Sequence, residues 1–249
     1  MSTTAEREYP RLRTLGGFTL YRTGRPVRAG EWRSRKAREL LILLVARRHE
    51  SIRRERVSEL LWPGTDPASC RNRLSVALCT VRGMLDPRRQ WAPDIFVTTY
   101  ADAVRLTNLP VDAYEFLAGA RRALRAHQAG AELAYCLLLA ADAAYTGDFC
   151  TGDPCLEYAV PLREEVRATH VAVLRALASA AADIDDTERQ HRCFLRLLEH
   201  DPFDEFAQVG LVRLLRAQRR LGEASRRYAH YARRMAELGC RPRPLAELA

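Results

Sequence analysis

Long apolar runs are missing from this chain. No stretch approaches the roughly 18 consecutive apolar residues that a membrane-spanning helix requires. The first residues, MSTTAEREYPRLR, also lack the apolar core of a signal peptide. We therefore expect a cytoplasmic protein that is neither secreted nor bound to a membrane.

Paired cysteines and clustered histidines are missing too. The seven cysteines include no CxxC pair, and the six histidines show no metal-ligand spacing. This excludes a zinc framework and a disulfide scaffold, and we expect no metal and no cofactor. Cys150 and Cys155 lie close together in the loop TGDFCTGDPCLEY. A disulfide between them stays open, although reduced thiols are favoured in a cytosolic protein.

Catalytic motifs are equally scarce. The sequence contains no glycine-rich phosphate loop, no GxSxG and no HExxH. The adjacent acids Glu164 and Glu165 fit a solvated helix face better than an acid–base pair. The chain therefore offers no chemical site for an enzyme.

Lysine is nearly absent, and the positive charge is unevenly distributed. Lys36 is the single lysine among 40 basic residues. Residues 1–108 hold 21 Lys/Arg and 11 Asp/Glu, a net charge of +10, whereas residues 109–249 hold 19 and 20, a net charge of −1. Arginine binds phosphate through two parallel hydrogen bonds. An asymmetry of this kind favours a polyanion as the partner of the first half.

One helix is predicted from Asp66 to Leu85. Asp66 is a suitable N-cap, and proline follows it at the first helical position. The apolar positions with 4-3-4 spacing share one face: Leu74, Leu78, Val81 and Leu85. The other positions carry small or cationic side chains: Ser69, Arg71, Asn72, Arg73, Ser75, Val76, Thr80 and Arg82. A slim helix with cationic edges and no carboxylate suits the major groove of DNA.

The elements around this helix predict a winged helix-turn-helix. Short strands are expected at 12–15 and 18–21, with a third starting at Val27. Helices follow at 34–48, capped by Ser34, and at 54–61. Beyond the helix at 66–85, residues 95–99 and 103–106 form a predicted hairpin. The order of strands, three helices and hairpin is typical of this fold, whose third helix enters the major groove.

The second half is almost entirely helical in pattern. Breaks are expected at Gly130, at 147–154, at Asp185-Asp186, at Asp201-Pro202, at Leu221-Gly222 and at Gly239. Two of the helical segments recur after about 34 residues, the tetratricopeptide period. Repeat-like stacking of helical hairpins is therefore favoured over a non-repeating bundle.

Several sequence blocks, in this order and spacing, carry a family resemblance. In the first half they are WRSRKARELL at 32–41, ELLWP at 59–63 with Asp66-Pro67, and RNRLSVAL at 71–78. In the second half they are Val111-Asp112, YTGDF at 145–149 with Gly152-Asp153-Pro154, DPFDE at 201–205 and GEA at 222–224. The chain resembles the SARP-type bacterial transcriptional activators. The resemblance implies a mainly α fold, with an OmpR-type winged helix-turn-helix (α+β) at 10–108. An all-α, tetratricopeptide-like bacterial transcriptional activation domain at 109–249 follows it.

The resemblance also implies a function. Similar proteins bind direct repeats in promoter DNA as a side-by-side homodimer and recruit RNA polymerase holoenzyme through its sigma factor and other subunits. They often activate a biosynthetic gene cluster, such as one for an antibiotic. The expected base contacts are Ser69, Asn72, Arg73 and Val76. The expected phosphate contacts are Arg33, Arg35, Lys36, Arg71, Ser75, Thr80 and Arg82. The expected polymerase contacts are Trp62, Pro63, Gly64 and Thr65.

One feature departs from the family pattern. The turn between the two hairpin strands, Thr99 to Ala103, contains no glycine and carries Asp102. A carboxylate at the tip would repel phosphate, so the question of whether this wing contacts the minor groove stays open.

Two other functions stay open from sequence. One is a helical-repeat adaptor whose basic half binds an acidic protein. The other is a thiol-responsive regulator that uses Cys150 and Cys155.

Overall fold

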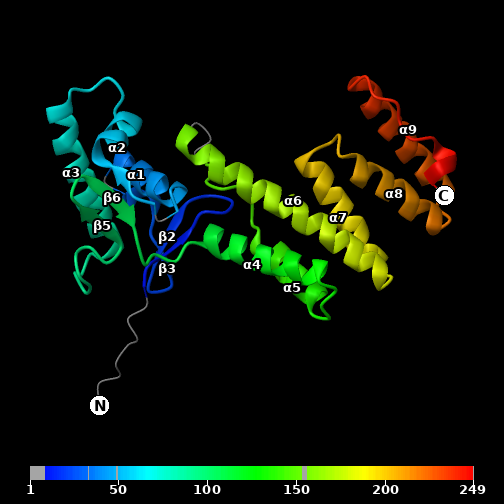
Figure 1. Ribbon diagram of the computed structural model, residues 1–249, viewed down its shortest axis with the longest axis horizontal. Helices are drawn as coiled ribbons and strands as arrows, with labels where there is room; N and C mark the ends of the chain where they lie inside the picture. The colour runs from blue at the N-terminus through cyan, green and yellow to red at the C-terminus, as the bar shows by residue number, and fades with distance from the viewer. Residues whose placement is uncertain (1–8, 33, 49, 153–155, 249) are drawn as a thin grey trace, which may run out of the picture. The chain divides into compact units, whose positions relative to one another are not determined.

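The computed structural model describes residues 9–32, 34–48, 50–152 and 156–248. Figure 1 shows their helices and strands in chain order. Contacts divide them into two units. The first unit holds the described residues up to Glu115 together with Thr146–Val166, and the second holds Phe116–Tyr145 and the described residues from Arg167 onward. None of the described helices is long and apolar enough to cross a membrane.

The first unit opens with a small antiparallel sheet. Its order is β1 (Arg11–Arg13), β2 (Thr19–Arg22) and β3 (Arg25–Pro26). Leu12 of β1 pairs with Leu20 of β2, and both side chains are fully buried. The first two predicted strands are confirmed with shifted ends. The third strand ends at Pro26, one residue before its expected start at Val27, because the β2–β3 turn follows at once after β2.

Three helices form the core of this unit: α1 (Arg35–Ala46), α2 (Arg54–Leu61) and α3 (Pro67–Leu85). The predicted caps are confirmed. The Ser34 hydroxyl accepts a hydrogen bond from the Ala37 N–H at 3.2 Å. The Asp66 carboxylate accepts bonds from the N–H groups of Ala68 and Ser69, both at 3.0 Å. These local bonds satisfy donors that the first helical turn leaves free.

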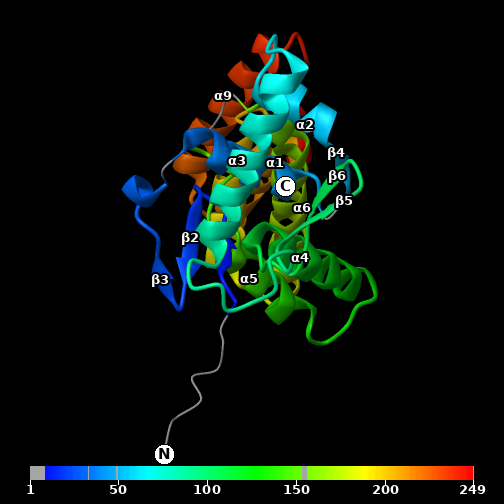
Figure 2. The ribbon, with the colours of Figure 1, turned by 90° about the vertical axis from the view of Figure 1, so that its left-hand side faces the viewer.

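A second antiparallel sheet lies beside the helices. It contains β4 (Ile52–Arg53), β5 (Val97–Tyr100) and β6 (Ala103–Leu106), in the order β4-β6-β5. The predicted hairpin is confirmed as β5 and β6. Strand β4 was not predicted, because two residues are too few to show an alternating pattern. Figure 2 shows α3 along one face of the unit, with the hairpin at its side.

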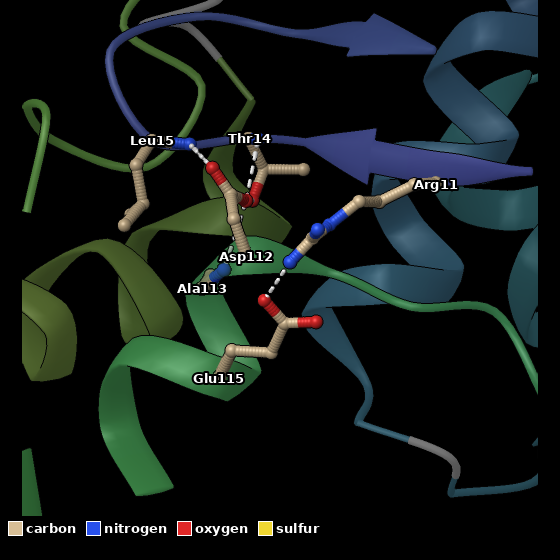
Figure 3. A network of polar contacts seen from close by, with 6 residues as sticks. All are labelled: Arg11, Thr14, Leu15, Asp112, Ala113 and Glu115. Atoms are coloured by element: carbon tan, nitrogen blue, oxygen red, sulfur yellow. Dashed lines mark hydrogen bonds and ion pairs between the residues drawn. The ribbon is translucent and has the colours of Figure 1, made fainter. Parts of the chain in front are cut away.

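Residues from the second half of the sequence complete the first sheet. The Leu12 N–H donates to the Pro110 carbonyl at 2.9 Å, beyond the edge of β1. Figure 3 shows Asp112 accepting bonds from the Thr14 N–H and hydroxyl, both at 2.6 Å, and from the Leu15 N–H at 3.1 Å. Arg11 and Glu115 form an ion pair in the same network.

The loop after α5 takes part as well. The Gly16 N–H donates to the Asp148 carbonyl at 3.0 Å, and the Cys150 N–H donates to the Thr14 carbonyl at 2.7 Å. Phe149 is fully buried and forms an isolated bridge with Leu15. The contacts therefore group residues 109–115 and 146–166 with the first half, which differs from the expected division at 108/109.

The helices of the second half are α4 (Asp112–Gln128), α5 (Ala134–Ala144), α6 (Val160–Asp183), α7 (Thr187–His200), α8 (Glu205–Ala217) and α9 (Leu221–Glu237). Short 3-10 turns occur at η1 (Ala29–Glu31), η2 (Glu157–Ala159) and η3 (Leu245–Leu248). Helix α9 begins at Leu221, so the break expected at Leu221-Gly222 lies just before it. Arg219, with φ +59°, makes that turn.

Consecutive helices of the second unit pack as hairpins, α7 on α8 and α8 on α9. Asp186 and Asp204 cap the N-termini of α7 and α8. At the α7–α8 contact, a Cβ added to Gly210 would lie 2.4 Å from the ring of Phe194. Glycine thus lets the ring of one helix approach the backbone of the next.

Candidate nucleic-acid interface

Helix α3 has one buried and one exposed face. Its buried side chains are Cys70, Leu74, Ala77, Leu78, Val81, Met84 and Leu85. Ser69, Asn72 and Arg73 are exposed, and Val76 is 60% exposed. The predicted apolar stripe is confirmed, and the predicted base-contact residues lie on the outer face of the helix.

The N-terminus of α3 is occupied by an ionised carboxylate. Hydrogen bonds from the side chain and backbone of Ser69 hold the pKa of Asp66 below its usual value. The guanidinium of Arg73 reaches back to the Thr65 hydroxyl at 3.5 Å. Because Asp66 neutralises the helix end, an anion outside the protein would meet the side chains of α3 and not its N-terminus.

The hydroxyls on the helix flank bond to their own helix. Ser75 donates to the Arg71 carbonyl and Thr80 to the Val76 carbonyl, each at 2.9 Å. A guanidinium nitrogen of Arg54, at the start of α2, lies 3.3 Å from the Ser75 hydroxyl. Arg54 was not among the predicted contacts, although the run RRER at 53–56 is a cationic signal beside the helix.

Arg82 is engaged inside the protein. Its guanidinium donates to the Val97 carbonyl at 2.9 Å and to the Thr99 hydroxyl at 3.1 Å. Arg82 therefore braces the second half of α3 against β5. Its role differs from that of Arg73, although both residues belong to one helix.

The cations of α1 surround one acid. Arg35 and Lys36 both pair with Glu39 at 2.8 Å, and the Glu39 side chain is buried. Arg35 is nonetheless 86% exposed, so it remains accessible to an outside anion. Arg33 lies outside the described residues.

The turn before α3 is tight. Trp62 is half-buried and ends α2, while Pro63 and Gly64 are exposed. Gly64 has φ +73°, a conformation that favours glycine, and the Thr65 N–H donates to the Trp62 carbonyl at 3.3 Å. The turn thus presents its two middle residues to solvent.

The tip of the β5–β6 hairpin carries no cation. Tyr100 is 83% exposed, and Ala101 adopts φ +49° in place of a glycine. The Asp102 carbonyl accepts the Arg54 N–H at 2.8 Å, which ties the tip to α2. Asp102 is exposed.

Comparison with known proteins places this geometry in a family. Residues 111–248, more than half of the chain, match the family described as Bacterial transcriptional activator domain. The chain belongs to this family. The family match confirms the resemblance to SARP-type bacterial transcriptional activators that was noted in the sequence.

A solved structure shows that this activator shares its fold beyond the matched domain. Mycobacterium tuberculosis EmbR, in complex with a low-affinity phosphopeptide, superposes on 96% of the activator with a TM-score of 0.80 and 21% sequence identity. The activator covers 64% of the EmbR chain. The likeness confirms the predicted fold class, a mainly helical chain that begins with small sheets. No curated protein sequence matches the activator.

Of the two cysteines in the Gly/Pro loop at 147–154 and just after it, the structure describes one. Cys150 is fully buried. Cys155 lies outside the described residues, so the thiol-responsive reading stays untested. Among the residues that the structure describes, no group of three or more His, Cys, Asp and Glu side chains is placed to hold a metal ion.

Proposed function

We propose that this activator binds promoter DNA by laying the outer face of α3 in the major groove. One observation carries the proposal: from Ser69 to Leu85 the exposed face of α3 holds short or cationic side chains and no carboxylate. The excess positive charge of the first half supports the same partner, because DNA attracts cations along its whole backbone. An acidic protein partner would not require a slim helix.

We assign the reading of bases to Ser69, Asn72, Arg73 and Val76. The amide of Asn72 suits the two hydrogen-bonding groups of adenine, and Arg73 suits guanine. Val76 is exposed at a position where a thymine methyl group would shield it from water.

We assign phosphate binding to polar and cationic groups of α1, α2 and α3 and to Arg33: Arg33, Arg35, Lys36, Arg71, Ser75, Thr80 and the newly found Arg54. These contacts would position the helix without reading sequence. Arg82, which the sequence placed with them, is assigned instead to bracing the hairpin, because its guanidinium already donates to the Val97 carbonyl and the Thr99 hydroxyl.

We further propose that two copies bind a direct repeat side by side, and that the Trp62–Thr65 turn contacts RNA polymerase at a promoter of a biosynthetic gene cluster. The exposure of Pro63 and Gly64 supports a contact at this turn. Transcription in vitro with purified polymerase holoenzyme tests it. Charge introduced by Pro63→Asp should reduce activation while leaving DNA affinity unchanged.

The experiment for DNA binding measures affinity by fluorescence anisotropy over a range of salt concentrations. The DNA is a duplex whose site has been located by footprinting. If about six phosphates are neutralised, the log–log slope of affinity against salt should be near −5. Arg73→Ala should weaken binding by about 1–3 kcal/mol and relax the preference at one base pair.

Arg241→Ala is the matched control, since Arg241 is also exposed but lies in the second unit. It should bind like the unaltered chain. Loss of affinity from Arg73→Ala that is equal on every sequence would show that Arg73 holds only phosphate. Absence of any sequence preference in the intact protein would refute the proposed function.

A further inference from the structure

A cavity of about 520 Å³ lies in the first unit, away from the outer face of α3. The β2–β3 hairpin forms one side of it, and the end of α3 with the following loop forms the other. Figure 2 shows both elements. The volume falls within the roughly 300–1,000 Å³ that is usual for small-molecule sites.

Arginines dominate the polar part of the lining. Arg25, Arg28 and Arg88 all contribute to it, and all three are exposed. Their guanidinium groups have no hydrogen-bond or ion-pair partner in the described part of the chain, whereas Arg22, also in the lining, pairs with Glu31 at 2.8 Å. Three cations with unused donors therefore line one cavity.

The carboxylates of the lining are already engaged. Glu31 accepts bonds from Arg22 and from the Arg28 N–H at 3.0 Å. Asp86 accepts bonds from the N–H groups of Gln90 and Trp91, both at 2.9 Å. Neither acid is placed to neutralise the three arginines, so the cavity has a net positive charge.

The apolar part of the lining is rigid. Trp91 is half-buried, and its ring meets Tyr9 and Phe96 edge-on, with centroids 5.6 and 5.4 Å apart. Pro26 and Pro87, both exposed, add an aliphatic surface. A wall that is already ordered loses little conformational entropy when a ligand binds.

We infer that this cavity binds a small organic anion with a flat, apolar body. The unused guanidinium groups would hold its carboxylate or phosphate through charge-assisted hydrogen bonds. The indole of Trp91 and the rings of Pro26 and Pro87 would cover its apolar part. The bound molecule would lie against Asp86, the C-cap of the same helix whose first half carries Ser69 to Val76.

DNA phosphate is a poorer occupant of this cavity. Leu85 lies nine positions beyond Val76, which is about 14 Å along the helix at 1.5 Å per residue. The backbone of a duplex also offers no flat apolar surface for Trp91. A separate small ligand therefore explains both halves of the lining.

The test titrates the full chain with 2-naphthoate and with 2-naphthamide by isothermal titration calorimetry. The two probes share a ring system and differ in charge. We expect naphthoate to bind at least about tenfold more tightly, as a carboxylate held by guanidinium groups should. The double variant Arg25→Gln/Arg28→Gln should lose that advantage while keeping its circular dichroism spectrum, because both side chains are exposed.

Arg105→Gln is the matched control, an exposed arginine of β6 outside the lining. It should bind naphthoate like the unaltered chain. Equal affinity of naphthoate and naphthamide for the unaltered chain would overturn the inference. An equal loss of naphthoate affinity in Arg105→Gln and in the double variant would overturn it too, because it would indicate general charge attraction. A double variant with reduced DNA affinity and a shallower salt slope would overturn it as well, because the arginines would then be phosphate contacts.

Discussion

At the scale of single residues, two arginines of α3 differ in the hydrogen bonds that their guanidinium groups make, and this difference decides which of them can bind an outside anion. Arg73 reaches a single hydroxyl, that of Thr65, at 3.5 Å and is otherwise turned to solvent. Arg82 donates to the Val97 carbonyl and to the Thr99 hydroxyl within 3.1 Å. An arginine free to reorient can bind an outside anion, whereas one that holds a carbonyl stabilises the fold.

Replacement of Arg82 should therefore reduce stability and not the salt dependence of DNA binding. Arg82→Ala leaves the Val97 carbonyl without its charged donor, and we expect the free energy of unfolding to fall by about 1–3 kcal/mol. Urea unfolding measures this. Arg71→Ala is the contrasting variant: Arg71 is exposed, so stability should hold while the salt slope drops by about one. The reverse result would restore Arg82 as a phosphate contact.

A second residue-scale feature lies in the second unit. The fully buried His170 bonds to Asp142 at 3.0 Å and to His200 at 2.8 Å, and it stacks on Tyr145 with ring centroids 3.8 Å apart. Burial by itself would raise the pKa of Asp142. The hydrogen bond with His170 and the charge of Arg196 outweigh burial and lower that pKa.

The sign of this shift predicts a pH dependence. A carboxyl whose pKa is lower in the folded chain stabilises the fold above its unfolded pKa of about 3.9, and this contribution is lost as pH falls through the folded pKa. We expect Asp142→Asn to destabilise the second unit at pH 7 and to reduce its further loss of stability below about pH 4. Denaturant unfolding at the two pH values measures it. An identical acid profile in both proteins would contradict the role of Asp142.

At the scale of elements, the packing of α7 on α8 depends on a missing side chain. Gly210 lies inside α8, where alanine would be the better helix former by about 1 kcal/mol. A Cβ at this position would nevertheless lie 2.4 Å from the Phe194 ring, and Phe194 is buried. Contact between the helices therefore overrides the preference of the helix itself.

Gly210→Ala should destabilise the second unit, by about 1–3 kcal/mol, because the Phe194 ring has to move. The control is Gly119→Ala in α4, where nothing lies within 4 Å of the added carbon. We expect that variant to gain up to about 1 kcal/mol from helix propensity. Thermal unfolding of the two variants separates the effects, and equal midpoints would show that the close approach has no cost.

At the scale of the whole molecule, the first unit is built from distant parts of the sequence. Asp112 bonds to Thr14, 98 positions earlier, and the buried Phe149 bridges to Leu15. The edge of β1 is thus completed by chain that the sequence placed in the second domain. Residues that carry the activation-domain signature thereby also support the half that we propose to bind DNA.

Removal of Asp112 should loosen the first unit. Asp112→Ala leaves the N–H groups of Thr14 and Leu15 without their charged acceptor, and we expect a loss of about 2–3 kcal/mol. Glu115→Ala is the matched control, because its ion pair with Arg11 is about half exposed and contributes less than about 1 kcal/mol. Hydrogen exchange of the β1 amides reports the difference. Equal protection in both variants would show that Asp112 is dispensable.

The sequence by itself determined those helices and strands whose signals lie within a few neighbouring residues. The caps Ser34 and Asp66, the apolar stripe of α3 and the hairpin of β5 and β6 each depend on residues within a few positions of one another. The same local pattern determined which face of α3 is exposed. The blocks that carry the family resemblance are short segments of the same kind.

Only the tertiary structure decided which polar side chains are free to bind a molecule outside the protein and which are engaged within it. The engagement of Arg82, the network around Asp112 and the cationic cavity join residues that are 15 to 98 positions apart, or elements that no local pattern pairs. A hydrogen bond depends on distance and angle in space, and these follow from packing and not from spacing along the chain. For that reason the sequence predicted which side chains of α3 are exposed, while the fold showed that Arg82 already donates to β5.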